Sequence, residues 1–286
     1  MSADLCRAVR RAAVQGRVRA EGLLFGGVPL EVKGPGLEFV DYREYVYGDD
    51  IRRVDWRVSA RAGRNLEKLF VRVYRSERRV KVIYVVDLTS SLGFKDKLEA
   101  LAFTVGLHAR ISAALEDIVG LITVTHEARF HGFMEPELLV SRLLRMICRD
   151  GAAGSLDISS AARLVSKVAG KSPVFLYTDY ANKVASYRRL NLLARAMGAP
   201  LYAYIFATPG ETGKAHVEGL TSLLDFESGN ALTVSLGEYA ALVRSHVASV
   251  KASLGFSRVF EVESLKQAMA YVPSLAVSYI RARGRY

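Results

Sequence analysis

The sequence predicts an α/β protein built on a mostly parallel sheet with helices on both faces. From residue 80 onward, short runs rich in β-branched residues alternate with longer segments whose apolar residues recur at helical spacing. Strands connected through helices in this way pair in parallel. Before residue 80 the chain is irregular, dense in charge and broken by glycines. We therefore expect an N-terminal β-rich extension over residues 1–79 and an α/β domain with C-terminal helices over residues 80–286.

The strands of the main sheet are expected from short, strongly apolar runs of the kind that is typical of buried strands. These runs occupy residues 80–86, 118–125, 174–178 and 201–207. Residues 128–133 are expected to pair with residues 118–125 as a hairpin. A separate hairpin is expected from residues 223–226 and 231–234, which flank a turn-forming Glu-Ser-Gly-Asn sequence.

The helices are expected from apolar residues at 3.6-residue spacing, most clearly in residues 95–115. A short amphipathic helix is expected near the N-terminus, and the arginine-rich tail over residues 281–285 is expected to be frayed. The other helical segments are predicted at residues 135–148, 157–168, 184–197, 237–254 and 263–280.

The composition is that of a folded globular protein. Half of the 286 residues are hydrophobic and 24% are charged, so disorder is not expected for most of the chain. The apolar runs are too short to span a bilayer, and arginines interrupt the apolar residues near the N-terminus. We therefore expect a cytoplasmic protein, in which Cys6 and Cys148 are expected to be reduced thiols.

The net charge of +11 allows binding to nucleic acid or to anionic lipid. The basic residues are spread along the chain, however, and no nucleic-acid-binding motif accompanies them. A generally basic, well-solvated surface explains the same charge. Nucleic-acid binding therefore stays an alternative that depends on charge alone.

Oxygen-bearing side chains gather in the sequence Asp87-Leu88-Thr89-Ser90-Ser91, directly after the first predicted strand. Thr89 and Ser91 alternate after Asp87, so their hydroxyls can lie on the same side as its carboxylate. Three oxygen ligands on a tight strand-to-helix turn suit a hard cation such as Mg²⁺ or Mn²⁺. The alternative is a helix-capping turn, in which Asp87 and Thr89 bond to free backbone N–H groups.

Two other loops are expected at the same edge of the sheet. Asp179 follows the strand predicted over residues 174–178, and Ser155 lies in the loop before the helix predicted over residues 157–168. In open α/β sheets, ligands bind beyond the carboxyl ends of the strands. Asp87, Thr89, Ser91, Ser155 and Asp179 together therefore favour a metal site. Two carboxylates neutralise a divalent ion, which can still attract one external carboxylate.

These residues resemble a known arrangement. The run from Asp87 through Thr89 to Ser91, followed by Ser155 and Thr178-Asp179, resembles the metal-ion-dependent adhesion site of von Willebrand factor A domains. The upstream signature Gly48-Asp49-Asp50, running to Asp55-Trp56-Arg57, is similar to that of the family known as domain of unknown function 58. The sequence Asp225-x-Glu227-x-Gly229 also resembles the C-terminal part of that family.

The resemblance implies a von Willebrand factor A-like core, and a protein partner that is a MoxR-type AAA+ ATPase acting in chaperone-like assembly of complexes. It also implies that Thr89 and Ser91 bind the metal directly, whereas Asp87 and Asp179 often act through water. Thr89 stands where serine is usual, and Ser155 stands where threonine is usual. Many relatives carry two N-terminal membrane helices, which this sequence lacks.

The segment from Gly48 to Arg61 interleaves acidic and basic residues around a single tryptophan. Arginine–carboxylate pairs can be bidentate and rigid, so the segment can form a structural clasp that holds it on the core. The alternative is a docking surface for the partner, because tryptophan and arginine are enriched at interface hot spots. The candidates for partner binding are Trp56, Arg52, Arg53 and Arg57.

No motif indicates an enzyme. Residues 208–215 follow a predicted strand and resemble a phosphate-binding loop, but Thr208 replaces its first glycine and Ala215 replaces its serine or threonine. We interpret this segment as a solvent-exposed turn. The five histidines form no HExxH pair, and no GxSxG turn occurs. A non-catalytic binding module is therefore expected, with a metal-dependent hydrolase as an alternative.

Overall fold

A six-stranded sheet forms the centre of the computed structural model, which describes residues 3–25, 38–47, 49, 51, 54–62, 68–75, 79–214, 220–224 and 231–283. The strand order is β10-β7-β6-β3-β4-β5, and only β5 is antiparallel to its neighbour. The prediction of a mostly parallel sheet is confirmed. The strands are β3(Lys81–Asp87), β4(Ile118–Val124), β5(Ala128–Met134), β6(Val174–Thr178), β7(Leu201–Phe206) and β10(Val259–Val262).

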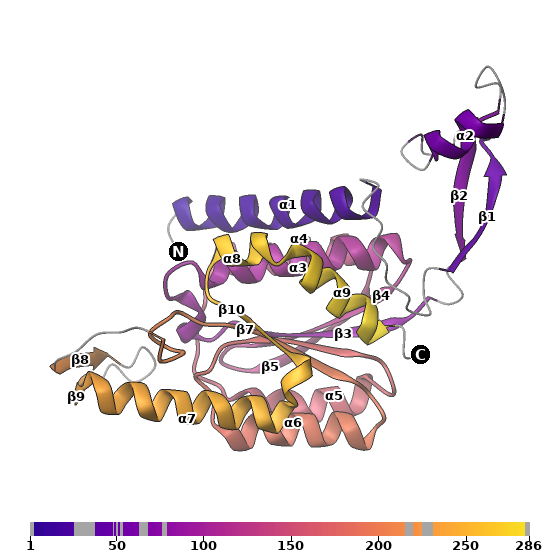
Figure 1. Ribbon diagram of the computed structural model, residues 1–286. Coiled ribbons are helices and arrows are strands. Elements are labelled where there is room, and N and C mark those ends of the chain that lie inside the picture. Colours follow the sequence, from indigo (N-terminus) through magenta and orange to yellow (C-terminus); the bar gives the residue numbers. More distant parts are fainter. Residues whose placement is uncertain are drawn as a thin grey trace.

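Helices cover both faces of this sheet, as Figure 1 shows. One face carries α1(Ala3–Phe25), α3(Lys97–Ala114), α4(Pro136–Asp150), α8(Leu265–Ala270) and α9(Val272–Arg283). The other carries α5(Ala162–Val168), α6(Val184–Ala196) and α7(Leu236–Leu254). Short 3-10 turns, η2(Ser90–Gly93), η3(Ile158–Ala161) and η4(Phe256–Arg258), complete the connections.

Strand β3 shows why the apolar runs form the sheet. Val82, Tyr84 and Val86 pack into the core on the α3 side, whereas Ile83 and Val85 pack into the core on the α6 side. A strand buried on both faces needs apolar residues at consecutive positions, because successive side chains point to opposite faces. Asp87 ends this strand and is fully buried.

An aromatic cluster joins the sheet to α3 and α9. His108 lies at its centre, with Nδ1 2.9 Å from the Tyr177 hydroxyl and Nε2 3.1 Å from the Leu275 carbonyl oxygen. The rings in contact around it are those of Phe175, Tyr177, Tyr204 and Tyr279. Burial lowers the pKa of His108 to about 3, so the ring is neutral.

Helix α1 packs directly against α3. A side chain at Gly16 would place its Cβ 2.0 Å from the Phe103 carbonyl oxygen, so glycine is needed where the two backbones meet. Cys6 of α1 and Cys148 of α4 form a disulfide. The expectation of two reduced thiols was therefore wrong, since 142 residues separate the cysteines and no spacing motif announces the bond.

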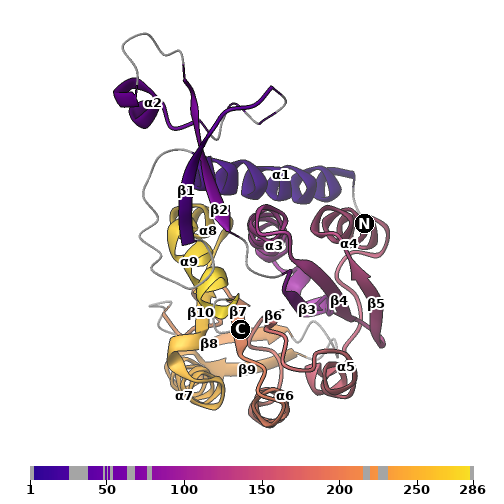
Figure 2. The ribbon, with the colours of Figure 1, turned by 90° about the vertical axis from the view of Figure 1, so that its right-hand side faces the viewer.

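The hairpin of β1(Glu38–Glu44) and β2(Phe70–Arg75) projects from the core together with α2(Trp56–Ala62), as Figures 1 and 2 show. The predicted β character of the N-terminal extension is present here, whereas α1 belongs to the helical layer on the sheet. Residues 28–32, whose sequence suggests a further short strand between glycines, lie outside the described residues.

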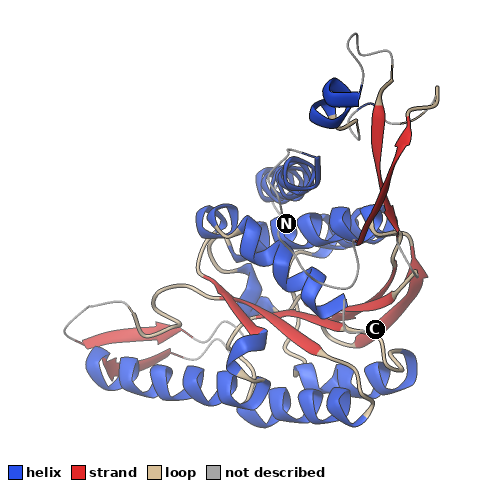
Figure 3. Cartoon of the chain, turned by 45° about the vertical axis from the view of Figure 1, so that its right-hand side comes forward, coloured by secondary structure: helices blue, strands red, loops and turns tan. Residues whose placement is uncertain are grey.

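The C-terminal part differs from prediction in two places. Strand β10 was not predicted, and the helix predicted over residues 263–280 is divided into α8 and α9. Arg283, expected in a frayed tail, is buried, and its Nε lies 2.8 Å from Asp117 Oδ1. The predicted hairpin is present as β8(Leu220–Leu224) and β9(Ala231–Ser235), beside α7 in Figure 3. Within the described ranges, no helix is long and apolar enough to cross a bilayer.

Candidate functional site

The candidate site lies where the strand order of the sheet reverses. The chain runs from β3 to β4 on one side and later returns to β6 on the other side of β3. Ligands of open α/β sheets bind beyond the carboxyl ends of the strands at this switch point. Asp87 ends β3, and Asp179 immediately follows β6. The structure therefore brings the two predicted carboxylates to the expected edge.

Four donors hold the carboxylate of Asp87. Oδ1 accepts hydrogen bonds from the Thr89 backbone N–H (3.0 Å) and the Thr89 hydroxyl (2.7 Å). Oδ2 accepts from the Thr178 hydroxyl (2.8 Å) and the Asn182 side-chain amide (3.3 Å). These bonds fix the orientation of the carboxylate at the end of β3.

Burial and a second carboxylate dominate the electrostatic environment of Asp87. Burial and the nearby charge of Asp179 raise the pKa of Asp87 to about 6, although the hydrogen bonds from Thr89 and Thr178 oppose this shift. A second carboxylate close to a buried one makes the ionised state costly. Binding of a cation would lower that cost.

The hydroxyls of Thr89 and Ser91 converge beside Asp87, as the sequence predicts. Their oxygen atoms lie 3.3 Å apart, and Thr89 Oγ1 also donates to Asp87. Thr89 is buried, whereas Ser91 is half-buried and lies in the turn η2. No side-chain capping bond is formed at the start of η2 by Thr89, so the simple capping interpretation does not describe this residue.

Lys97 occupies the other side of the site, and sequence reasoning missed it. Its ammonium group lies 3.0 Å from Asp179 Oδ2 and 2.6 Å from Glu211 Oε1. Burial opposes the charge on Lys97, but the charges and hydrogen bonds of Asp179 and Glu211 outweigh burial and raise its pKa. Lys97 is therefore protonated and is a resident cation. One sequence signal could have indicated Lys97, because this lysine begins a helix whose other residues are mostly apolar.

Glu211 corrects the interpretation of residues 208–215. The segment was expected to be a solvent-exposed turn, but Thr208 and Thr212 are buried. Glu211 Oε2 accepts the Thr208 backbone N–H at 2.7 Å, while Oε1 accepts from Lys97. The turn after β7 therefore contributes a carboxylate to the site.

The loop that carries Ser155 lies next to the Asp87 turn. The backbone N–H and hydroxyl of Ser90 donate to the Gly154 carbonyl oxygen at 2.9 and 3.1 Å. Gly154 has φ +102°, and a Cβ there would lie 2.4 Å from the Thr125 carbonyl carbon, so glycine is required. Ser155 itself is exposed, and its hydroxyl has no hydrogen-bond partner among the described residues.

Asn182 connects the loops and was also missed. Its side-chain nitrogen donates to Asp87 Oδ2, and its oxygen accepts the Ile158 backbone N–H at 2.9 Å. The amide therefore ties the loop after β6 both to the end of β3 and to η3. A single asparagine three residues after Asp179 carries no recognisable spacing signal.

We refer to Asp87, Thr89, Ser91, Lys97, Asp179 and Glu211 as the strand-end cluster. Its three carboxylates and one ammonium leave a formal charge of −2, which one divalent cation would neutralise. Across the described ranges, no three His, Cys, Asp or Glu side chains converge as metal ligands. A cation here would therefore need the hydroxyls of Thr89 and Ser91, whose oxygen chemistry fits Mg²⁺ or Mn²⁺.

The carboxylates of the projecting hairpin stabilise the hairpin itself. Asp49 forms a bidentate pair with Arg43, with both N–O distances 2.6 Å. Asp55 Oδ1 accepts the backbone N–H of Arg57 at 3.0 Å and caps α2. These contacts stay within the projecting hairpin and do not join it to the core, and Arg43 was not among the predicted partners.

Two of the four candidate partner-binding residues can be placed. The side chain of Trp56 is 54% exposed, and the guanidinium of Arg57 has no ion-pair partner within the described part of the chain. Arg52 and Arg53 lie outside the described residues, as does the sequence Asp225-x-Glu227-x-Gly229. Exposed Val46, Tyr47 and Ile51 accompany Trp56 on the same projecting hairpin.

The fold and the strand-end cluster define an α/β protein with a polar site at the switch point of its sheet. The chain belongs to the family described as "Protein of unknown function DUF58", which matches residues 41–253. It is 34% identical over 90 residues to uncharacterized proteins of Mycobacterium bovis and Mycobacterium tuberculosis. Each match covers 32% of this chain and 27% of the relative, so the shared stretch spans about a quarter of those proteins.

Two solved structures are similar to the chain over about two thirds of its length. The conserved hypothetical protein BatB from Bacteroides thetaiotaomicron has a TM-score of 0.44 and 16% identity, with 68% of this chain and 96% of that chain covered. An aerotolerance-related membrane protein from Bacteroides fragilis, crystallised with multiple mutations to serines, has a TM-score of 0.40 and 15% identity, with 69% and 98% covered.

Proposed function

We propose that this chain is a non-catalytic protein-binding module with a von Willebrand factor A-like core, whose strand-end cluster holds Mg²⁺ or Mn²⁺ and captures a carboxylate of a partner. The observation that carries the proposal is the state of Asp87. It is fully buried, its pKa is raised to about 6 beside Asp179, and two hydroxyls converge next to it. This combination favours a bound cation over a structural turn.

The residues in and around the cluster have different roles in this proposal. Thr178 and Asn182 hold Asp87, and Asp87 in turn holds the Thr89 hydroxyl toward Ser91. Lys97 holds Asp179 in place from the opposite side. When bound, the cation would supply the positive charge that attracts an acidic side chain. Ser91 and Ser155 are at least partly exposed, so a partner side chain can approach from that side.

A binding role agrees better with the cluster than hydrolysis does. Nucleophilic or acid–base chemistry would need a base within hydrogen-bond reach of Ser91 or Thr89. Among the histidines whose hydrogen bonds the structure describes, His108, His131 and His246 bond to groups other than Asp87 and Asp179. Asp87 does accept the Thr89 hydroxyl, and its further donors fix the carboxylate in that position, which suits the orientation of a metal ligand.

The projecting hairpin supplies a second contact in this proposal. Trp56 and Arg57 are exposed on it, while Asp49 and Asp55 stabilise its fold. Exposed aromatic and arginine side chains are frequent anchors of protein interfaces. The partner that we propose is a MoxR-type AAA+ ATPase, with which the protein would act in chaperone-like assembly of complexes.

The test of this function is whether the chain retains a MoxR-type ATPase taken from the organism that encodes the chain. The immobilised chain should retain the purified MoxR-type ATPase in Mg²⁺ and release it in EDTA, and Asp87→Ala should not retain it in either buffer. Asp4→Ala, an exposed carboxylate on α1, is the matched control and should behave as wild type. Equal retention in Mg²⁺ and EDTA by all three proteins would refute metal-dependent capture.

A further inference from the structure

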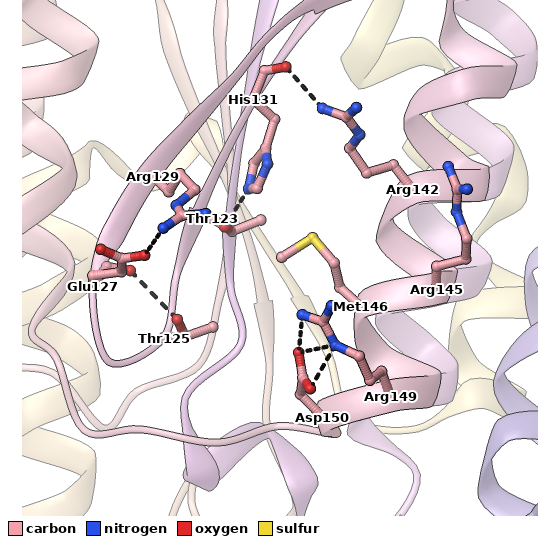
Figure 4. A pocket seen from close by; sticks show the side chains of 10 residues that line it. All are labelled: Thr123, Thr125, Glu127, Arg129, His131, Arg142, Arg145, Met146, Arg149 and Asp150. Carbon is pink, nitrogen blue, oxygen red and sulfur yellow. Dashed lines mark hydrogen bonds and ion pairs between the residues drawn. The ribbon is translucent and has the colours of Figure 1, made fainter.

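A basic pocket lies between the β4–β5 hairpin and α4. Figure 4 shows it from close by. Its volume is about 700 Å³, which falls within the usual range of small-ligand sites. Four arginines line it: Arg129 from β5, and Arg142, Arg145 and Arg149 from α4.

The spacing of the arginines on α4 explains why they share one face. Positions i, i+3 and i+7 of a helix lie above one another, and Arg142, Arg145 and Arg149 have this spacing. On the opposite face, Leu139, Leu143 and Ile147 are buried in the core. The helix thus packs its apolar face on the sheet and places its arginines along the pocket.

The pocket carries an excess of positive charge. Only two carboxylates line it, Glu127 and Asp150, and they pair with Arg129 and Arg149. Four arginines against two carboxylates leave a formal charge of +2. The Arg142 guanidinium donates to the His131 carbonyl oxygen at 3.0 Å, and Arg145 has no hydrogen bond or ion pair within the described residues. The guanidinium groups of Arg142 and Arg145 therefore have no carboxylate partner in the part of the chain that the structure describes.

Neutral polar groups complete the lining. Thr123 Oγ1 lies 2.8 Å from His131 Nε2, and the Thr125 side chain lies lower on the same hairpin in Figure 4. Burial and the positive charges of Arg142 and Arg129 lower the pKa of His131. The ring is therefore neutral near pH 7, and the charge that faces a ligand comes from the arginines.

We propose that this pocket binds a small ligand with two or more phosphoryl groups. The planar guanidinium fork matches phosphate oxygens in bidentate geometry, and a group of arginines at one site is typical of phosphate recognition. The hydroxyls and the neutral histidine offer further polar contacts to a ligand. The side chain of Met146 gives the pocket an apolar surface.

The boundaries of the pocket favour a small molecule over a polymer. At one end, the Arg142 side chain crosses to the hairpin and donates to the His131 carbonyl oxygen. At the other end, the chain leaving Asp150 passes beneath the hairpin in Figure 4, and the Leu156 backbone N–H donates to the Thr125 carbonyl oxygen at 3.2 Å. A nucleic-acid strand would need a groove that continues past both ends.

The pocket uses none of the proposed metal ligands, so its function can be tested separately. The measurement is isothermal titration calorimetry of the full chain in EDTA, which removes divalent ions from the solution. The probes are inorganic pyrophosphate and ADP, with citrate as a polycarboxylate of similar charge and oligothymidylate as a nucleic acid. The variants are Arg142→Gln and Arg145→Gln. Arg189→Gln on α6, an exposed arginine outside the pocket, is the matched control.

Pyrophosphate and ADP should each saturate one site on wild type and on Arg189→Gln. Arg145→Gln should weaken both by about tenfold, as expected for loss of one hydrogen-bonding group that binds an anion, and Arg142→Gln should do the same. Arg145 makes no bond to the described residues that its replacement would break, so that variant should fold. Tighter binding of ADP would identify a nucleotide ligand, and equal binding would show that the phosphoryl groups suffice.

Three results would overturn the proposal. The first is no saturable binding of pyrophosphate or ADP to wild type, and the second is equal binding by all variants. The third is binding of citrate or oligothymidylate that is as tight as that of pyrophosphate and equally dependent on Arg145. None of these outcomes concerns metal-dependent capture of the ATPase, which is measured in Mg²⁺ with a different variant.

Discussion

The Lys97 ammonium lies 3.0 Å from Asp179 Oδ2, within a fully buried contact between the start of α3 and the end of β6. The same ammonium lies 2.6 Å from Glu211. The protein thus places its own cation beside the carboxylates proposed to hold a metal. Lys97 neutralises one of the three carboxylates of the strand-end cluster. The remaining negative charge is not balanced, and the pKa of Asp87 is raised.

Replacing Lys97 should therefore strengthen metal binding. Lys97→Met removes a competing positive charge, and we expect Mn²⁺ to bind at least about tenfold more tightly. Glu211→Gln removes a negative charge and should weaken Mn²⁺ binding. Calorimetric titration near neutral pH measures both changes, with a thermal unfolding curve to confirm that each variant is folded.

Lys251→Met is the matched control for this pair. Lys251 pairs with Glu261 at 2.8 Å, outside the strand-end cluster, so its loss changes the net charge equally but leaves Asp179 in place. Its Mn²⁺ affinity should stay near that of wild type. Unchanged or weaker binding by folded Lys97→Met would contradict the electrostatic account of the cluster.

Trp56 tests the role of the projecting hairpin. Because its side chain is 54% exposed, Trp56→Ala should change the free energy of unfolding by less than about 0.5 kcal/mol. We expect it to weaken binding of the ATPase by tenfold or more, as for a hot-spot residue, in surface plasmon resonance. Phe256→Ala, which replaces another exposed aromatic residue, in η4 and outside the hairpin, should leave binding unchanged. If Trp56→Ala bound the ATPase with wild-type affinity, the proposed role of Trp56 in binding would be wrong.

His108 should make the fold sensitive to acid. Its folded pKa of about 3 lies below the unfolded value of 6.5, so the unfolded chain takes up a proton between these values and the folded chain does not. Burial of the neutral ring therefore makes the free energy of unfolding depend on pH. Relative to its value above pH 6.5, this free energy falls by ~3 kcal/mol at about pH 4.

His108→Gln removes this titration. The raised pKa values of Asp87 and Asp117, both about 6, act in the opposite direction and favour the folded state as pH falls from 6 to about 4. The difference between wild type and variant isolates His108. Urea unfolding at several pH values should show a smaller loss of stability on acidification for His108→Gln, and parallel pH curves would refute this prediction.

The disulfide between Cys6 and Cys148 should stabilise the docking of α1. A bond that closes a long loop restricts the unfolded chain, and its removal should lower the free energy of unfolding by about 2–4 kcal/mol. Cys6→Ser and Cys148→Ser should be equally destabilised in urea, and dithiothreitol should bring wild type to the same stability. Wild-type stability in both variants would contradict a structural role for the bond.

Prediction from sequence succeeded where local patterns determine the structure. The β-branched run of residues 81–87 can be buried on both faces only as a central strand, and Asp87 then falls at its carboxyl end. Asp179 follows by the same reasoning from residues 174–178. The edge strand β10 has four residues, of which only Val262 is buried, so its pattern is too short and too weakly apolar to predict.

The features that were missed depend on contacts between distant residues. Lys97 and Asp179 are 82 residues apart, and Arg283 and Asp117 are 166 residues apart. Their burial follows from the packing of complete elements, which no local spacing indicates. The arginines of α4 are different, because their spacing is visible in the sequence, but their pocket requires the β4–β5 hairpin opposite them.

Direct titration of the strand-end cluster with Mg²⁺ or Mn²⁺ tests the central claim. The calorimetric experiment is performed near neutral pH, above the pKa of about 6 for Asp87, so that its carboxylate is ionised. Wild type should bind one ion, Ser91→Ala should bind it about tenfold more weakly or worse, and Asp87→Ala should not bind it while remaining folded. Ser166→Ala, a hydroxyl on α5 outside the cluster, should match wild type. Equal affinity in wild type and folded Asp87→Ala would contradict the account.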